Sequence, residues 1–186
     1  MLLIMVVGYC GAQMIAYADH AHSHQHGEIK VVPTSSTAVS FRGLLQIYEF
    51  EFLPYTNKEV NNDGWYDEDV RSAYGADRYL LYCGMTPVGF AVINLSSMIT
   101  GDPAVRDVGD FFIIPSHRKF GLGKQFAHEL FTRYAGLWEI RQLSNLQYAR
   151  SFWRKTIAAY VGDNFTDSDI NSHLWVGSVQ SFSVNT

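Results

Sequence analysis

Cysteine is scarce in this sequence: among 186 residues there are only two, Cys10 and Cys83. A pair of cysteines provides neither a disulfide framework nor a thiolate zinc site. Charge is also sparse, at 17% charged residues with a net charge of −4, so the basic surface that nucleic-acid binding requires is missing. The apolar share is 47%, which is enough to build the core of one folded domain of this length.

The first 18 residues contain no charged side chain. Ala16 and Ala18 stand at the spacing of a secretory cleavage site, but no Lys or Arg precedes the apolar run. The densely apolar part, Leu2–Val7, is short beside a membrane span, which takes about 20 apolar residues. We therefore expect a cytoplasmic protein without a membrane anchor, and the apolar leader leaves export open as an alternative.

Four histidines alternate with other residues just after the leader: His20, His22, His24 and His26. Neutral imidazole is a good ligand for zinc, copper or nickel, so one hypothesis for this tract is weak metal chelation. The other, which we favour, is an unstructured leader. The sequence thus predicts a poorly ordered segment over residues 1–28 and a folded domain over residues 29–186.

Hydrophobic periodicity divides the folded domain into strands and helices. Strands are expected at residues 29–33, 78–83, 88–95, 105–114, 138–143 and 173–183. Helices are expected at residues 39–52, 65–74, 121–134 and 145–161, and a polar loop at residues 163–172; Pro54 ends the first helix. Strand pairs mixed with helical crossovers predict an α/β (α+β) domain, with a mixed, mostly antiparallel central sheet flanked by helices.

The segment Phe111–Gln125, FFIIPSHRKFGLGKQ, joins a strand to a helix through a glycine-containing turn. Glycine lets the backbone approach a ligand closely, and the first N–H groups of a helix have no partner within it. The helix dipole adds partial positive charge, and Arg118, Lys119 and Lys124 are nearby cations. This combination predicts a binding site for phosphate.

Two common phosphate motifs do not fit this turn. A P-loop, GxxxxGK[ST], would need glycine at Arg118 and Ser or Thr at Gln125. A dinucleotide fingerprint, GxGxxG, would need a third glycine at Phe126, where close helix–strand packing forbids a large side chain.

A third pattern does fit, because Arg118-x-x-Gly121-x-Gly123 matches the [RQ]xxGx[GA] pattern of the GNAT superfamily of acyl-CoA N-acyltransferases. Ala149-x-x-Phe152-Trp153 resembles the A-x-x-F-Y/W segment of the same superfamily. The order of elements over residues 29–183 is also similar. The resemblance implies a GNAT-like fold and acetyl-CoA as cosubstrate.

The resemblance also implies where acetyl-CoA would lie. Backbone groups of Phe112, Ile113 and Ile114 would pair with the pantetheine arm, in a gap between their strand and the next one. The turn from Lys119 to Lys124 would hold the diphosphate, mostly through backbone N–H groups. The expected binding residues are Phe112, Ile113, Ile114, Arg118, Lys119, Phe120, Gly121, Leu122, Gly123, Lys124, Asn145 and Phe152.

The implied reaction is direct acetyl transfer to a primary amine. Asp110, a carboxylate within an apolar strand, is the first choice for the base, and Glu139 is the reserve; the alternative for Asp110 is a strand residue that faces water. The backbone N–H of Ile113 is the expected donor to the oxyanion. Many relatives carry a tyrosine where Trp153 stands, so the thiolate takes its proton from another tyrosine, such as Tyr148, or from solvent.

The sequence therefore predicts an N-acetyltransferase for a primary amine of a small molecule or peptide, with no metal and no nucleic-acid partner; a homodimer is left open. The first alternative is a non-catalytic acyl-CoA-binding module, which the loss of the usual tyrosine favours slightly. The second is an exported metal-binding protein, suggested by the leader and the histidine tract. Export conflicts with the enzyme because acetyl-CoA is scarce outside the cytoplasm.

Overall fold

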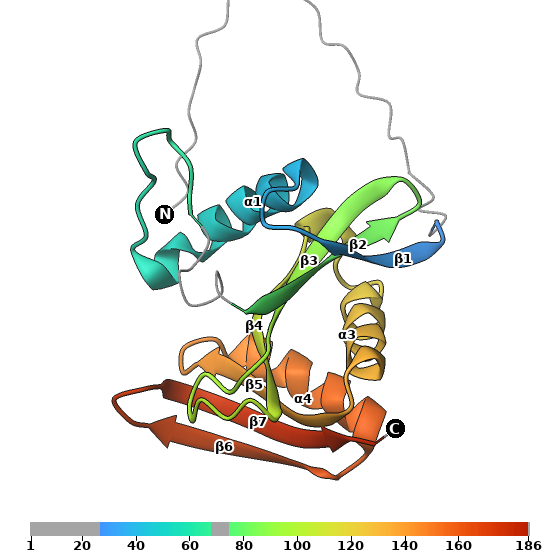
Figure 1. Cartoon of the computed structure of the whole chain (residues 1–186), viewed down its shortest axis with the longest axis vertical. Helices are drawn as coiled ribbons and strands as arrows, with labels where there is room; N and C mark the ends of the chain where they lie inside the picture. The colour runs from blue at the N-terminus through green and yellow to red at the C-terminus, as the bar shows by residue number, and fades with distance from the viewer. Residues whose placement is uncertain (1–26, 68–74, 186) are drawn as a thin grey trace, which may run out of the picture.

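The computed structural model describes residues 27–67 and 75–185 (Figure 1). The apolar leader and the histidine tract lie outside the described residues, and so does most of the segment 65–74, for which the sequence predicts a short helix. The helices are α1 (Val39–Thr56), α3 (Leu122–Arg133) and α4 (Gln147–Val161), with a 3-10 turn η1 at Pro115–His117. The strands are β1 (Ile29–Thr34), β2 (Ala76–Cys83), β3 (Thr86–Asn94), β4 (Val105–Ile113), β5 (Gly136–Leu143), β6 (Phe165–Asn171) and β7 (Val176–Val184).

The strands of the described residues form one seven-stranded sheet in the order β1-β2-β3-β4-β5-β7-β6. Every neighbouring pair is antiparallel except β4 and β5, which are parallel and are joined by the crossover helix α3. The expected fold class, a mixed and mostly antiparallel sheet flanked by helices, is therefore confirmed. In Figure 1, β4 runs between the half of the sheet that holds β1 to β3 and the half that holds β5 to β7.

The helices cover opposite faces of this sheet. On one face, the apolar stripe of α1, which includes Phe41 and Leu45, packs against Phe90 and Phe112 of the sheet. On the other face, α3 and α4 enclose the larger core, in which Phe126, Leu130, Phe131 and Ile157 are at most 2% exposed; two aromatic strand residues, Trp138 and Phe182, pack among them. Both helical stripes follow the spacing of three and four residues that places side chains on one face of a helix.

Two elements differ from the sequence-based expectation. Residues 165–171 form strand β6, which pairs antiparallel with β7, instead of the polar loop predicted there. Helix α1 continues through Pro54 to Thr56 and ends at Asn57, whose φ is 51° and whose N–H donates to Leu53 O. The proline lies in the last turn of α1. Because proline has no N–H, one backbone hydrogen bond is missing there, but few helical residues follow it.

Within the described ranges, none of the helices combines the length and the apolar character that a bilayer crossing needs. The same part of the chain contains no group of three His, Cys, Asp or Glu side chains arranged to hold a metal ion.

Candidate functional site

Strands β4 and β5 part halfway along their length. They pair in register only from Val105 opposite Leu137 to Val108 opposite Ile140. Beyond that point β4 pairs with β3 alone and β5 with β7 alone. A β-bulge falls at the same place, because Val108 lies opposite Ile93 and Asp110 opposite Val92, which leaves Gly109 as the extra residue. A cavity of about 1190 Å³ opens at this fork, between the end of β4, the end of β5, α1, α4 and the turn before α3.

The register of β4 against β3 determines which backbone groups face the fork. The N–H of Ile114 donates to Val88 O at 2.9 Å, so the hydrogen-bonded pairs of this ladder include Phe112 with Phe90. In an antiparallel ladder the residues between such pairs turn their N–H and C=O groups away from the partner strand. The groups of Ile113 therefore point into the fork, whereas the backbone groups of Phe112 and the N–H of Ile114 face β3. Phe111, which the sequence analysis missed, alternates with Ile113 and also faces the fork.

The turn between β4 and α3 presents backbone amides to the same cavity. Its conformation is left-handed at two positions, with φ of 69° at Lys119 and 79° at Gly121. The first backbone hydrogen bond of the helix runs from Gln125 N–H to Gly121 O at 3.1 Å, so the amides of residues 122–124 precede the helical ladder. Within residues 119–124, four of the expected residues line the cavity: Lys119, Gly121, Gly123 and Lys124. The side chain of Leu122 packs into the core instead, and Phe120 is exposed outside the cavity.

Gly123 lies where the turn, β4 and α4 meet. A Cβ atom at this position would lie 3.2 Å from Cζ of Phe152 and 3.8 Å from Cγ1 of Ile113. The contact with Phe152 is tight, so glycine allows the first turn of α3 to approach this ring without displacing it. Phe152 also lines the cavity and packs beside Phe111 with ring centroids 6.0 Å apart.

Arg118 is bound within the protein and is not a free cation at the turn. Its Nε donates to Ile113 O at 2.7 Å, and its two Nη atoms donate to the two carboxylate oxygens of Glu51 on α1, also at 2.7 Å. The guanidinium lies over the ring of Phe112, 5.4 Å from the centroid. Arg118 therefore links α1 to the end of β4, and it contributes at most part of its hydrogen-bonding capacity to an anion.

Asp110 faces α1 because of the bulge at Gly109. The extra residue places Asp110 on the same side of the sheet as Phe112, while Val108 belongs to the core under α3 and α4. The hydroxyl of Tyr48 donates to Asp110 Oδ1 at 2.9 Å, and both residues line the cavity. Burial raises the pKa of Tyr48 well above 10.0, and the charge of Asp110 raises it further. The phenol therefore stays protonated at neutral pH and acts as a hydrogen-bond donor.

The remaining expected residues fall in different places. Tyr148 lines the cavity, and its pKa is raised by partial burial and by Tyr55 and Glu51 nearby, although the side chain is 63% exposed. Asn145 is exposed and lies outside the cavity, where Leu146 lines the wall instead, so the expected contact of Asn145 is not supported. Trp153 is 6% exposed, packs against Phe111 and Phe152 in the core, and also lines the cavity.

A buried ion pair bridges the fork and was not foreseen from the sequence. Asp107 of β4, which is fully buried, accepts from Arg141 of β5 through Nε at 2.7 Å and Nη2 at 2.9 Å. Asn94 of β3 donates to the same carboxylate at 2.9 Å, so the cluster ties three strands together where β4 and β5 diverge. Glu139, the reserve candidate for the base, accepts from Ser97 at 2.7 Å and lies outside the cavity.

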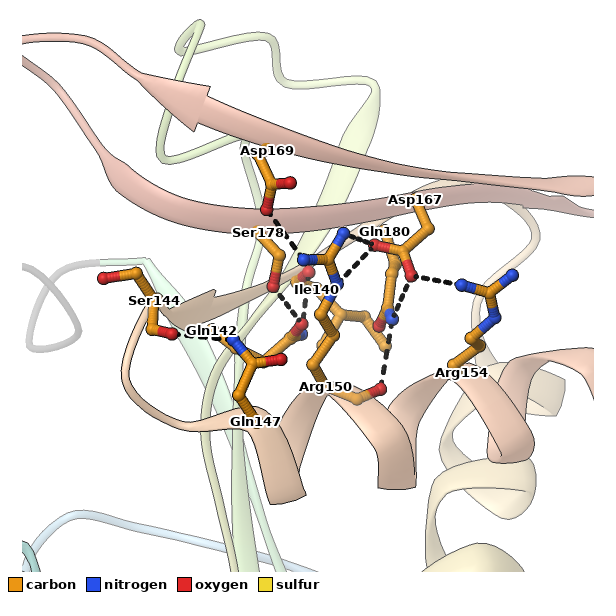
Figure 2. A network of polar contacts seen from close by, with 10 residues as sticks. All are labelled: Ile140, Gln142, Ser144, Gln147, Arg150, Arg154, Asp167, Asp169, Ser178 and Gln180. Atoms are coloured by element: carbon orange, nitrogen blue, oxygen red, sulfur yellow. Dashed lines mark hydrogen bonds and ion pairs between the residues drawn. The ribbon is translucent and has the colours of Figure 1, made fainter.

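Helix α4, which carries Phe152, is held against the last two strands by a second polar network (Figure 2). Arg150 lies between two aspartates of β6, donating through Nε to Asp167 at 3.0 Å and through Nη1 to Asp169 at 2.7 Å. Gln180 of β7 donates to the backbone oxygen of Arg150 at 3.2 Å and to Asp167 at 3.4 Å. These contacts fix the α4 wall of the cavity relative to β6 and β7.

The same architecture occurs in solved acetyltransferases. A Bacillus subtilis acetyltransferase in complex with CoA matches with a TM-score of 0.53 and 12% identity, over 85% of this chain and 100% of that one. A GNAT family acetyltransferase from Elizabethkingia anophelis with acetyl-CoA bound matches with a TM-score of 0.53 and 10% identity, over 84% and 98%. This chain has the fold of the GNAT acyl-CoA N-acyltransferases. The GNAT fold also includes the Escherichia coli ribosomal-protein-S18-alanine N-acetyltransferase, which matches with a TM-score of 0.54 and 9% identity, over 86% and 96%. No protein-family model and no curated protein matches the sequence.

Proposed function

We propose that the protein transfers the acetyl group of acetyl-CoA directly to a primary amine of a small molecule or peptide. The observation that carries the proposal is the cavity itself, which joins an amide-lined turn at a helix N-terminus to the free backbone edge of β4. A diphosphate suits the turn, and an amide-containing arm suits the strand edge. The solved acetyltransferases with bound CoA or acetyl-CoA that share the fold support this choice of cosubstrate.

In this proposal the amides of Leu122, Gly123 and Lys124 hold the diphosphate, and the side chains of Lys119 and Lys124 add positive charge. The pantetheine arm lies in the fork against Phe111 and Ile113, whose N–H groups point into it. The thioester then lies beside Ile113, on the wall of β4 that leads to Asp110.

The proposed reaction begins with a protonated amine that loses its proton to Asp110. The amine nitrogen attacks the thioester carbonyl carbon, and the N–H of Ile113 stabilises the oxyanion that forms. The C–S bond breaks as the carbonyl re-forms, and the nitrogen releases its second proton to solvent, which leaves a neutral acetamide and the thiolate of CoA. The thiolate takes its proton from Tyr148 or from solvent, because Trp153 occupies the position where many relatives of the superfamily carry a tyrosine.

The acceptor half of the cavity is lined by Glu49 and Asp67 as well as Asp110. Lys58 forms a salt bridge with Glu49, so this pair adds no net charge to the acceptor half. Carboxylates around the acceptor position favour a cationic amine over a neutral nucleophile such as an alcohol.

The test is acetyl-CoA turnover measured by release of free thiol, with spermidine, Nα-acetyl-lysine amide and the tripeptide Ala-Gly-Gly as acceptors. We expect thiol release that depends on an acceptor, with equimolar acetamide detected by mass spectrometry. Asp110→Asn, which keeps the shape of the side chain and removes its basicity, should lower kcat by about 10²-fold or more. The transferase proposal fails if CoA binds tightly but no amine accelerates thiol release.

The second candidate is a non-catalytic acyl-CoA-binding module, favoured by one observation: Trp153 is a buried core residue that lacks an ionisable proton. In that case acetyl-CoA binds and remains intact with every acceptor. The same assay therefore separates the two candidates.

Because acetyl-CoA is an intracellular metabolite, the enzyme proposal also implies a cytoplasmic location.

A further inference from the structure

The hydroxyl of Tyr48 is a polar group in the cavity that neither the sequence motifs nor the proposed reaction uses. It comes from α1, and it donates to Asp110 Oδ1 at 2.9 Å. We propose that Tyr48 is the positioning residue that holds the Asp110 carboxylate toward the acceptor amine. This inference rests on the proposed transferase function and deepens it.

The ring of Tyr48 is itself fixed by aromatic contacts on three sides. It stacks on Phe52 of α1 with centroids 5.1 Å apart and meets Phe90 edge-on at 5.5 Å and Phe112 at 5.7 Å. Tyr48 also follows Leu44 and Leu45 along the buried stripe of α1. A ring held by both its helix and the sheet leaves its hydroxyl little freedom, so the hydrogen bond fixes the rotamer of Asp110.

The position of Asp110 in the sheet explains why the orientation of its carboxylate matters. The bulge at Gly109 turns Asp110 away from the core and toward α1, at the point where β4 has lost its pairing with β5. The short carboxylate is thus attached to a strand with one free edge. To abstract a proton, the carboxylate must lie within hydrogen-bond reach of the ammonium. The Tyr48 hydroxyl, bound to one carboxylate oxygen, orients the other oxygen toward the ammonium.

The charges around this pair come from several elements. Glu49 of α1 and Tyr148 of α4 act on the Tyr48 hydroxyl together with Asp110, and all of them raise the pKa of the phenol. Lys58 neutralises Glu49, while Arg118 lies over the neighbouring Phe112 ring and is bound to Glu51. Tyr48 therefore stays protonated and acts only as a donor, which favours the ionised form of its carboxylate partner.

The test uses Tyr48→Phe, which keeps the ring and removes only the hydroxyl. The pH dependence of kcat/KM is measured with the best acceptor among spermidine, Nα-acetyl-lysine amide and Ala-Gly-Gly. Without the donor the carboxylate protonates more readily, so the acidic limb of the profile should move to higher pH by about one unit. At neutral pH kcat should fall about tenfold while the KM for acetyl-CoA stays unchanged.

Tyr82→Phe is the matched control, because Tyr82 packs against the same apolar cluster as Tyr48 and lies outside the cavity. It should reproduce the wild-type profile. The proposal is overturned if the Tyr48→Phe profile superimposes on that of the wild type, if only the KM for acetyl-CoA changes, or if Tyr82→Phe causes the same shift. Absence of turnover by the wild-type protein with every acceptor would instead remove the transferase function itself, and with it this role for Tyr48.

Discussion

Gly123 is the residue at which three walls of the cavity touch, so a single added methyl group tests their fit. In Gly123→Ala the new Cβ lies 3.2 Å from Phe152 Cζ, and the ring must move by a few tenths of an ångström. Overpacking of this kind costs about 1 kcal/mol of stability. We expect a loss of CoA affinity of about tenfold, because a small displacement of positioning groups has a large effect on a preorganised site.

Gly43→Ala is the control for that substitution. Gly43 is an exposed residue of α1 with nothing within 4 Å of its added Cβ, so alanine should raise stability by about 0.5–1 kcal/mol through helix propensity. CoA affinity should not change. Calorimetric titration and urea denaturation measure both quantities, and equal affinity in Gly123→Ala and the wild type would show that the approach of Phe152 does not matter for binding.

At this scale the sequence predicts the turn before α3 but not the contacts of its side chains. The motif around Gly121 and Gly123 correctly indicates the turn, because glycine spacing is local information. The salt bridge between Arg118 and Glu51 could not be predicted, because the two residues are 67 positions apart and meet only in the folded chain. The choice of Ile113 over Ile114 depends on the register with β3, which one strand considered alone does not reveal.

At the scale of elements, the contact of α4 with β6 depends on Arg150 (Figure 2). Arg150→Met leaves Asp167, whose side chain is 7% exposed, without its main cationic partner. We expect a loss of about 2 kcal/mol in the free energy of unfolding, because a nearly buried carboxylate that loses its partner is strongly destabilising. Arg154→Met removes a contact to the same carboxylate from a side chain that is 65% exposed, and should cost less than about 0.5 kcal/mol.

Urea denaturation of the two variants measures the difference. Equal stability losses would mean that Asp167 is satisfied by Gln180 and solvent, and that Arg150 does not anchor α4.

The same network explains why the sequence analysis did not predict strand β6. Its segment, FTDSDIN, places Asp167 and Asp169 where an ordinary strand would carry apolar residues, and their partner Arg150 lies on a helix that precedes them. The elements with clear apolar alternation or helical periodicity, by contrast, were predicted to within a few residues.

At the scale of the whole molecule, two protonated tyrosines make stability depend on alkaline pH. The pKa of Tyr48 is raised well above 10.0 mainly by burial, and that of Tyr134 is raised by burial and by its hydrogen bonds to Asp77 and Tyr79. The stabilisation from a raised pKa is fully present below the unfolded value near 10 and is lost as pH rises above it, because the unfolded phenols ionise. The free energy of unfolding should therefore fall above about pH 10.

Tyrosinate absorbance, recorded with circular dichroism, checks this expectation. Of the 11 tyrosines, Tyr48 and Tyr134 should ionise only as the fold is lost, and Tyr134→Phe should flatten the alkaline fall in stability. Reversible ionisation of all 11 tyrosines near pH 10 with the fold intact would contradict it.

The sequence shows these aromatic residues but not their burial, which depends on how α1 and the segment after α3 pack against the sheet.

The central claim is that the turn before α3 binds the diphosphate of CoA at the fork of β4 and β5. Calorimetric titration with CoA and, separately, with pantetheine tests it most directly, because pantetheine carries the same arm without the diphosphate. The account predicts one CoA site per chain and binding of pantetheine that is weaker by about tenfold or more. No heat from millimolar CoA, or equal affinities for the two ligands, would contradict it.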